Sequence, residues 1–143
     1  MRQHLFIIVC SGLMIACSTI RKQSVTHLPV WMTGTFTDDY GIKYAINDTL
    51  FWQQPSAKYH IINWNKEEQY LLVKNDENNS SEKNLYSRID YMEFKNIKPY
   101  TWGFCLTVYD AKDTITAMKI PAANRDIPKK GCNGYPFSRM KHQ

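Results

Sequence analysis

The chain has 143 residues, of which 43% are hydrophobic and 22% charged, and its formal net charge is +5 at pH 7. This length allows one domain with a hydrophobic core and excludes a chain of two typical domains. The densest basic group lies near the C-terminus, at Lys129, Lys130, Arg139 and Lys141. It suits acidic partners, although a solvated basic face without a partner is the simpler interpretation.

The N-terminal segment predicts export. Arg2 precedes an apolar run from Leu5 to Ile15, and Ala16 follows that run. This order is typical of a signal peptide, and the run is shorter than the roughly 20 apolar residues of a permanent membrane-spanning helix. Residues 14–17 (Met-Ile-Ala-Cys) resemble a bacterial lipobox, which implies cleavage before Cys17 and acylation of its thiol. The alternative is an ordinary signal peptide that is followed by Cys by chance.

The export signal divides the chain into three parts. Residues 1–16 form the signal peptide, residues 17–28 a lipid-anchored tether without a sustained hydrophobic period, and residues 29–143 a single β domain. Ser18 follows Cys17 where some lipoproteins carry Asp; by analogy with lipoproteins in general, this favours the periplasmic face of the outer membrane. The anions available there are lipid headgroups, so we exclude nucleic acid as a partner.

Cysteine usage fits the same compartment. Cys10 leaves with the signal peptide and Cys17 is acylated, so Cys105 and Cys132 remain. The periplasm is oxidising, which predicts a disulfide between these two, with two buried free thiols as the alternative. Neither belongs to a Cys-x-x-Cys pair, so a thioredoxin-like redox role has no support.

Strands dominate the rest of the chain. Period-2 alternation and aromatic or β-branched content predict about eight strands, near residues 30–37, 42–46, 49–53, 58–65, 69–74, 85–94, 100–110 and 135–140. Short turns join most of them, as at residues 38–41 and 47–48. Eight strands joined in this way form an antiparallel meander that can close into a barrel and remove both exposed edges. An open sheet or a two-sheet sandwich would show the same alternation.

The seventh predicted strand has the clearest alternation. The apolar set that faces the core consists of Tyr100, Trp102, Phe104, Leu106 and Val108. Cys105 lies between members of this set and therefore points outward, where a segment that crosses the outside of the sheet can bring Cys132 to it. Residues 111–134 are that segment, a strap with a short helix near residues 113–118.

No pattern indicates catalysis. The sequence has no nucleophile elbow, no glycine-rich phosphate loop and no metal-spaced histidine cluster, so we expect no enzyme activity, no metal and no cofactor. His60 is interpreted as a half-buried strand residue. Asp38 and Asp39 fit a hairpin turn better than a calcium site. Arg88 and Asp90 share one face of a strand, either as a surface ion pair or as a buried polar pair inside the barrel.

Aromatic residues make up 13% of the chain and concentrate in the strands. One interpretation is an aromatic-lined cavity that binds a small apolar molecule, with Phe36, Tyr44, Trp102 and Phe104 as its lining. The alternative is a small barrel whose interior is filled by these rings.

Two short stretches carry a resemblance. Residues 31–36 (Trp-Met-Thr-Gly-Thr-Phe), followed by Asp-Tyr-Gly at 39–41, resemble the opening of lipocalin-like (calycin) domains, in which Gly-x-Trp begins the first strand. Phe36 stands at the place of that Trp. The resemblance implies an eight-stranded barrel in which Arg139 packs over Phe36. Residues 100–105 and 131–140 are also similar to segments of small bacterial lipoproteins, which implies a shared fold and disulfide but no activity.

Two functions fit these features. The first is a membrane-anchored envelope lipoprotein that holds a small apolar ligand, such as a lipid, inside the barrel. The second is a protein-binding or inhibitor-type envelope module, similar in design to small barrel lipoproteins that inhibit lysozyme, with a filled interior and contacts made by loops. Its candidate loops are residues 75–84 and 121–134.

Overall fold

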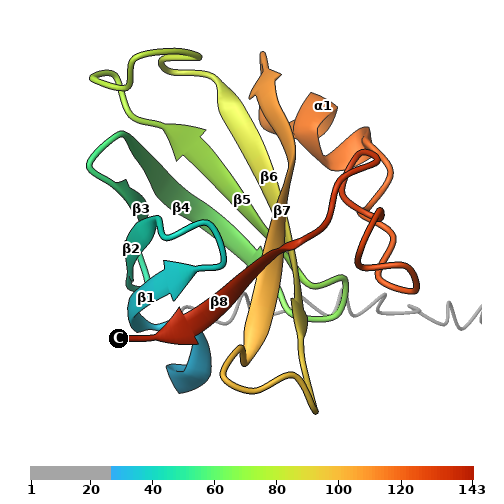
Figure 1. Cartoon of the computed structure of the whole chain (residues 1–143). Coiled ribbons are helices and arrows are strands. Elements are labelled where there is room, and N and C mark those ends of the chain that lie inside the picture. Colours follow the sequence, from blue (N-terminus) through green and yellow to red (C-terminus); the bar gives the residue numbers. More distant parts are fainter. Residues whose placement is uncertain (1–26) are drawn as a thin grey trace, which may run out of the picture.

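The chain folds into a closed barrel of eight antiparallel strands (Figure 1). The computed structural model describes residues 27–143. Strands that follow one another in sequence are neighbours in the sheet, and β8 closes the barrel against β1. The predicted all-β meander is confirmed, as is the short helix before the last strand. The strands are β1 (Gly34–Asp38), β2 (Lys43–Ile46), β3 (Leu50–Gln54), β4 (Ala57–Asn65), β5 (Tyr70–Asn75), β6 (Tyr86–Glu93), β7 (Trp102–Ala111) and β8 (Ser138–His142); the helices are η1 (Val30–Met32) and α1 (Thr114–Lys119).

Side chains of the turn residues fix the first two hairpins. The Asp38 carboxylate accepts hydrogen bonds from the backbone N–H groups of Tyr40 and Ile42, at 2.9 and 2.8 Å. Gly41 has φ +83°, a left-handed conformation that glycine adopts at no steric cost. In the next turn, Asn47 accepts from the N–H groups of Thr49 and Leu50. Both turns lie where the sequence predicts them, because short polar side chains compete for these backbone donors.

The barrel interior is one packed cluster of apolar side chains. Its largest fully buried members include Trp102, Phe36 and Phe51, and every strand except β4 contributes a buried residue. The side chains of β4 that pack against the cluster are only partly buried. Leu28 also belongs to this cluster, and its N–H donates to the Asp48 carboxylate at 2.7 Å. The residues just before β1 therefore belong to the fold, although residue 28 was expected in the tether.

The prediction that the first strand begins near residue 30 is wrong. Residues 30–32 form the 3₁₀ helix η1, and the strand begins only at Gly34. Met32 is fully buried in the interior cluster, and Trp31 packs against it. Alternating apolar residues are compatible with a strand, but here a single helical turn brings two of them into the core.

A β-bulge in β7 reverses the faces predicted for part of that strand. Arg88 of β6 pairs with Val108, but the next residue, Ile89, pairs with Leu106, so Thr107 is the extra residue. Side chains beyond the bulge change face. Val108, predicted inside, therefore packs outside the barrel with Tyr70 and the residues beneath α1.

Helix α1 covers part of the outer face of the barrel, on the right-hand side of Figure 1. The Asp113 carboxylate caps its N-terminus by accepting from the Thr116 N–H, at 2.7 Å. Ala117 is fully buried against the sheet. Among residues 27–143, no helix has the length and apolar character needed to span a membrane.

Candidate functional site

The strap, predicted at residues 111–134, comprises residues 112–137 in the structure, between β7 and β8. A disulfide holds it to the barrel. Cys105 of β7 and Cys132 are bonded, with their Cα atoms 5.4 Å apart. Cys105 points to the outer face, as predicted, but it is buried because Ala123 and Phe137 of the strap pack around it. The predicted disulfide is confirmed, and the strap lies against the sheet as a second layer.

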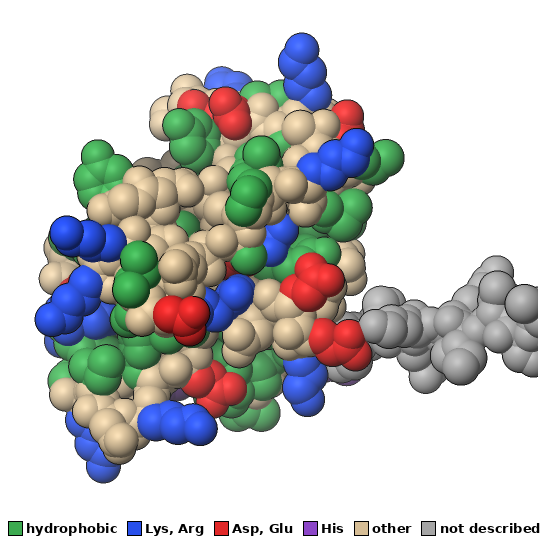
Figure 2. All heavy atoms as spheres, turned by 90° about the vertical axis from the view of Figure 1, so that its right-hand side faces the viewer, with side chains coloured by type: hydrophobic (Ala, Val, Ile, Leu, Met, Phe, Trp, Pro, Cys, Tyr) green, Lys and Arg blue, Asp and Glu red, His purple; other side chains and the backbone are tan. Residues whose placement is uncertain are grey.

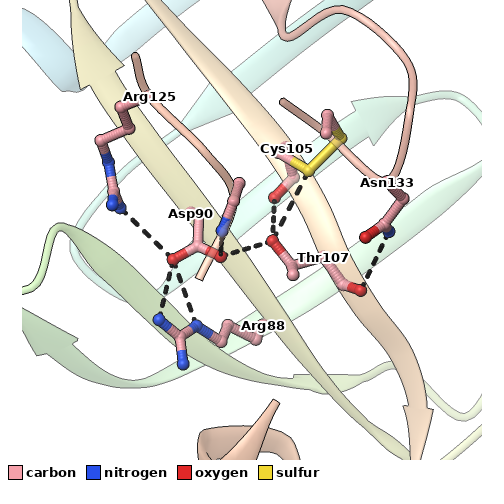
Figure 3. The surroundings of a disulfide bond; sticks show 8 residues. Arg88, Asp90, Cys105, Thr107, Arg125 and Asn133 are labelled. Atoms are coloured by element: carbon pink, nitrogen blue, oxygen red, sulfur yellow. Dashed lines mark hydrogen bonds and ion pairs between the residues drawn. A yellow bond between two sulfur atoms is a disulfide. The ribbon is translucent and has the colours of Figure 1, made fainter. Parts of the chain in front are cut away.

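A buried ion network lies beside the disulfide and was not predicted in full (Figure 3). Asp90 is completely buried and accepts hydrogen bonds from the Arg88 guanidinium, at 3.0 and 3.1 Å. It also accepts from Thr107 Oγ1 and from Arg125 Nη2, the latter at 3.3 Å. The pair is buried, as one of the two interpretations has it, but the predicted location inside the barrel is wrong, because the pair lies on the outer face of the sheet beneath the strap.

Arg125 links the strap to the backbone of the barrel. Its guanidinium donates to the carbonyl oxygens of Tyr91, Glu68 and Gln69, at 2.9, 3.0 and 2.8 Å. The Ala123 N–H of the strap donates to Asp90 at 3.1 Å. These hydrogen bonds fix the strap at a second place, several residues before the disulfide.

The tip of the strap is a tight turn with exposed side chains. Cys132 and Tyr135 exchange both of their backbone hydrogen bonds. Asn133 and Gly134, between them, have φ +50° and +90°, and the Asn133 amide donates to the Thr107 carbonyl. Tyr135 is 74% exposed at this tip. The turn therefore exposes an aromatic ring on a backbone whose conformation these hydrogen bonds fix.

Close backbone packing inside the strap depends on Gly131. A Cβ atom added there would lie 1.8 Å from the Asn124 carbonyl oxygen. Because this oxygen belongs to the backbone, no side-chain rotation can relieve the clash. We predict that Gly131→Ala separates the two arms of the strap and lowers the free energy of unfolding by about 1 to 3 kcal/mol. Gly134→Ala is the control, since nothing lies within 4 Å of its added methyl and only its left-handed φ is strained.

Urea unfolding and limited proteolysis measure the two variants. Gly131→Ala should lose more stability than Gly134→Ala and should be cleaved faster within residues 112–137. Equal stability losses and equal cleavage rates would show that the strap does not depend on this close approach.

An open groove lies between the strap and two turns of the barrel. Its volume is about 470 Å³, and its walls come from the β1–β2 turn, the β6–β7 turn, the strap and the start of β8. The residues that line it are Asp39, Tyr40, Phe94, Ile97, Pro128, Lys129, Pro136, Phe137 and Arg139. Sequence patterns did not indicate this groove, because its lining comes from four segments that only the barrel brings together.

No protein-family model, curated protein or solved structure matches this chain.

Arg139 is not placed as the lipocalin resemblance implies. Its Nε donates to the Asp39 carboxylate at 2.9 Å, and this hydrogen bond raises the pKa of Arg139 above its ordinary value. Its guanidinium lies over the Tyr100 ring, 4.6 Å from the centroid. The rings that pack against Phe36 are those of His142, at 4.2 Å, and Trp102. Tyr100, predicted to face the core, is half-buried and lies before β7.

The four aromatic residues proposed as a ligand lining lie together inside the barrel. Phe36 and Trp102 have ring centroids 5.4 Å apart, and Tyr44 and Phe104 have centroids 5.5 Å apart, both edge-on. The Tyr44 hydroxyl donates to Asp38, and burial, together with this carboxylate, raises the pKa of Tyr44 far above its usual range. The rings thus pack on one another, and their role as a ligand lining stays a prediction.

A smaller pocket opens where the loop between β5 and β6 meets the barrel. Its volume is about 260 Å³, and Tyr59 and Leu106, which pack against the interior cluster, line it together with polar residues of the loop.

Trp102 is fully buried, and its indole Nε1–H has no hydrogen-bond partner within residues 27–143. The barrel therefore keeps one unsatisfied donor in its interior.

Asp76, at the base of the same loop, gives stability that depends on pH. It accepts from the Asn78 N–H and pairs with His60 at 2.7 Å, and these contacts lower the pKa of Asp76 to about 2. A depressed pKa gives stability that is present above the ordinary value of 3.8 and lost as the pH falls toward 2. His60 lies on a strand, as predicted, and its side chain is 53% exposed.

We predict that Asp76→Asn flattens the acid side of the stability curve. The urea midpoint of the native chain should fall between about pH 4 and pH 2 more steeply than that of the variant. Glu77→Gln, one residue further along the exposed loop, is the charge-matched control and should keep the native slope. Parallel curves for Asp76→Asn and the native chain would contradict the assignment.

The remaining predicted features fall in two groups. Cys17, the signal peptide and most of the tether lie outside the described residues. Within the described part of the chain, no group of three or more His, Cys, Asp and Glu side chains could hold a metal ion. Asp38 and Asp39 lie in the predicted hairpin turn, where Asp38 holds the backbone and Asp39 pairs with Arg139.

Proposed function

We propose that this chain is an exported, lipid-anchored binding module without catalytic activity, and that it recognises a protein partner through the strap. The observation that carries the proposal is the contrast between the two sides of the sheet. Inside, the large rings pack on one another. Outside, a strap fixed by a disulfide and a buried ion network presents an exposed aromatic tip.

A fixed strap suits recognition because ordering a loop on binding costs free energy. Each side chain that becomes immobile costs about 0.5 to 1.5 kcal/mol, and a loop that is already ordered avoids most of this cost. Tyrosine is enriched among the residues that dominate binding energy at protein interfaces. Tyr135 and Ile127, which are 74% and 54% exposed, are therefore the contacts that we assign to the partner.

Charge alone does not define the partner. Figure 2 shows the side of the molecule that carries α1 and the strap, where Lys and Arg side chains are spread with acidic ones among them. No large field of one sign covers this face. Shape and the apolar tip of the strap therefore supply the specificity in our proposal, with Lys129 and Lys130 favouring an acidic rim on the partner.

Photo-crosslinking in the bacterium that produces the protein tests the strap directly. A photoreactive phenylalanine analogue replaces Tyr135 at the tip or Ile62 on β4, which is also exposed, at 49%. The proposal predicts a defined adduct of higher mass from position 135 and none of that mass from position 62. The same adducts from both positions, or none from position 135, would contradict recognition by the strap.

Export and anchoring rest on the signal peptide and on Cys17. In cells fed labelled palmitate, we predict label in the native chain and in Cys10→Ser, which changes a residue of the signal peptide. Cys17→Ser should lose the label. Label retained in Cys17→Ser would contradict the assignment of the acylated residue, and it would leave the test of the strap unaffected.

A second candidate function is the binding of a small apolar molecule inside a lipocalin-like barrel, at Phe36, Tyr44, Trp102 and Phe104. The unpaired indole N–H of Trp102 favours it, since a ligand oxygen could accept that hydrogen bond. Native mass spectrometry of the chain released from its membrane tests this candidate. A co-purifying small molecule that is lost in Trp102→Phe supports it, and a chain without added mass counts against it.

A further inference from the structure

The groove beneath the strap is open, apolar and held in shape by its surroundings. Its volume of about 470 Å³ falls within the range of sites that bind small molecules. The apolar part of its lining consists of Tyr40, Phe94, Ile97, Pro128, Pro136 and Phe137. The Phe137 N–H donates to the Pro128 carbonyl at 2.9 Å, so the strap wall is fixed where it faces the two barrel turns.

Two cationic side chains, Arg139 and Lys129, line this groove and are not fully paired among residues 27–143. Arg139 is oriented by Asp39 and by the Tyr100 ring, but only its backbone N–H and its Nε donate to Asp39. Its two terminal nitrogens have no hydrogen-bond acceptor among residues 27–143, and 43% of the side chain is exposed. Lys129 has no ion-pair partner in the same residues. With Asp39 included, the charged part of the lining carries a net charge of +1.

We propose that this groove binds a single-chain fatty acid, with the acyl chain against the apolar lining and the carboxylate on Arg139 and Lys129. The terminal nitrogens of a guanidinium match a carboxylate in two parallel hydrogen bonds. Asp39 holds Arg139 in place through Nε and leaves those nitrogens for the ligand. A ligand with a cationic or an uncharged head would leave this charge unmet, so the site favours an anionic head such as the carboxylate.

This site goes beyond the proposed recognition of a protein by the strap tip. It lies on the outside of the barrel, and it uses none of the four interior rings that the second candidate function requires. Binding of a fatty acid can therefore be measured on the purified chain without a partner, and its failure leaves the crosslinking test from Tyr135 intact.

The test uses a diazirine analogue of dodecanoate on the full chain in phosphatidylcholine vesicles. After irradiation, mass spectrometry should locate the adducts in residues 94–97 and 128–137. Unlabelled dodecanoate should displace the probe, and dodecyltrimethylammonium should not. Lys129→Glu should reduce labelling about tenfold, which corresponds to the loss of one charge-assisted hydrogen bond.

Two further variants separate the site from general effects of charge and folding. Lys74→Glu, which makes the same charge change at an exposed residue of β5, should label like the native chain. Ile97→Glu should abolish labelling at the groove while the urea midpoint stays close to native, since Ile97 is 42% exposed. Adducts inside the barrel, or labelling that Lys129→Glu and Lys74→Glu reduce equally, would overturn the proposal.

Discussion

Replacing both disulfide cysteines, as Cys105→Ala/Cys132→Ala, is expected to lower the free energy of unfolding by roughly 3 to 4 kcal/mol. The bond joins residues 27 positions apart, and in the chain-entropy model a closed loop of this size restricts the unfolded chain by about that amount. A second contribution comes from the packing of Ala123 and Phe137 around the bond. The loss would be a large fraction of the 5 to 15 kcal/mol that is typical of single domains.

Urea unfolding with and without reductant measures this effect and supplies its control. Reductant should lower the midpoint of the native chain and leave that of the double variant unchanged, because the variant has no bond to reduce. Ser80→Ala/Ser81→Ala substitutes two exposed residues in the loop between β5 and β6, and its urea midpoint should stay near the native value. A double cysteine variant as stable as the oxidised native chain would show that the strap is held without the disulfide.

Asp90→Asn is expected to lower the free energy of unfolding by about 3 to 5 kcal/mol. Asp90 is fully buried and balances the Arg88 guanidinium, which is only 4% exposed. Removing one partner of a buried ion pair leaves the other charge buried without compensation, which is the costly outcome. The hydrogen bonds from Thr107 and the Ala123 N–H would also lose their charged acceptor.

Two comparisons make the Asp90 result specific. Asp39→Asn removes the partner of Arg139, a pair that is more exposed than Arg88 and Asp90, and should cost about 1 kcal/mol or less. Adding Arg88→Met to Asp90→Asn should recover part of the loss, since the unpaired charge is then gone. If the two Asp variants were equally stable, or if Arg88→Met gave no recovery, the network would not carry the stability that we assign to it.

The sequence predicts the strands and their order well because the barrel is local. Each strand pairs with the next one along the chain, so alternation and turn residues specify most of the pairing. Asp38 and Asn47 illustrate this, since each fixes a turn through hydrogen bonds to residues within four positions. The disulfide was also predictable, because the predicted signal peptide and acylation site leave two cysteines and Cys105 lies on the outer face of β7.

Features that join distant segments were not predictable from patterns. Thr107 forms a bulge that turns Val108 to the outer face, and no periodicity distinguishes it from a regular strand residue. Arg125 lies in a strap without alternation, yet it reaches Asp90, 35 positions away. The groove combines the β1–β2 turn, the β6–β7 turn, the strap and the start of β8, so it exists only once the barrel is closed.

The most direct test of the central claim compares crosslinking from the strap tip with and without the disulfide. The photoreactive analogue is placed at position 135 in the native chain and in Cys105→Ala/Cys132→Ala, at equal amounts of protease-resistant protein. If the strap is a recognition element ordered in advance, the partner adduct should form in the native chain and be strongly reduced in the variant. Equal adduct yields from both chains would contradict the account.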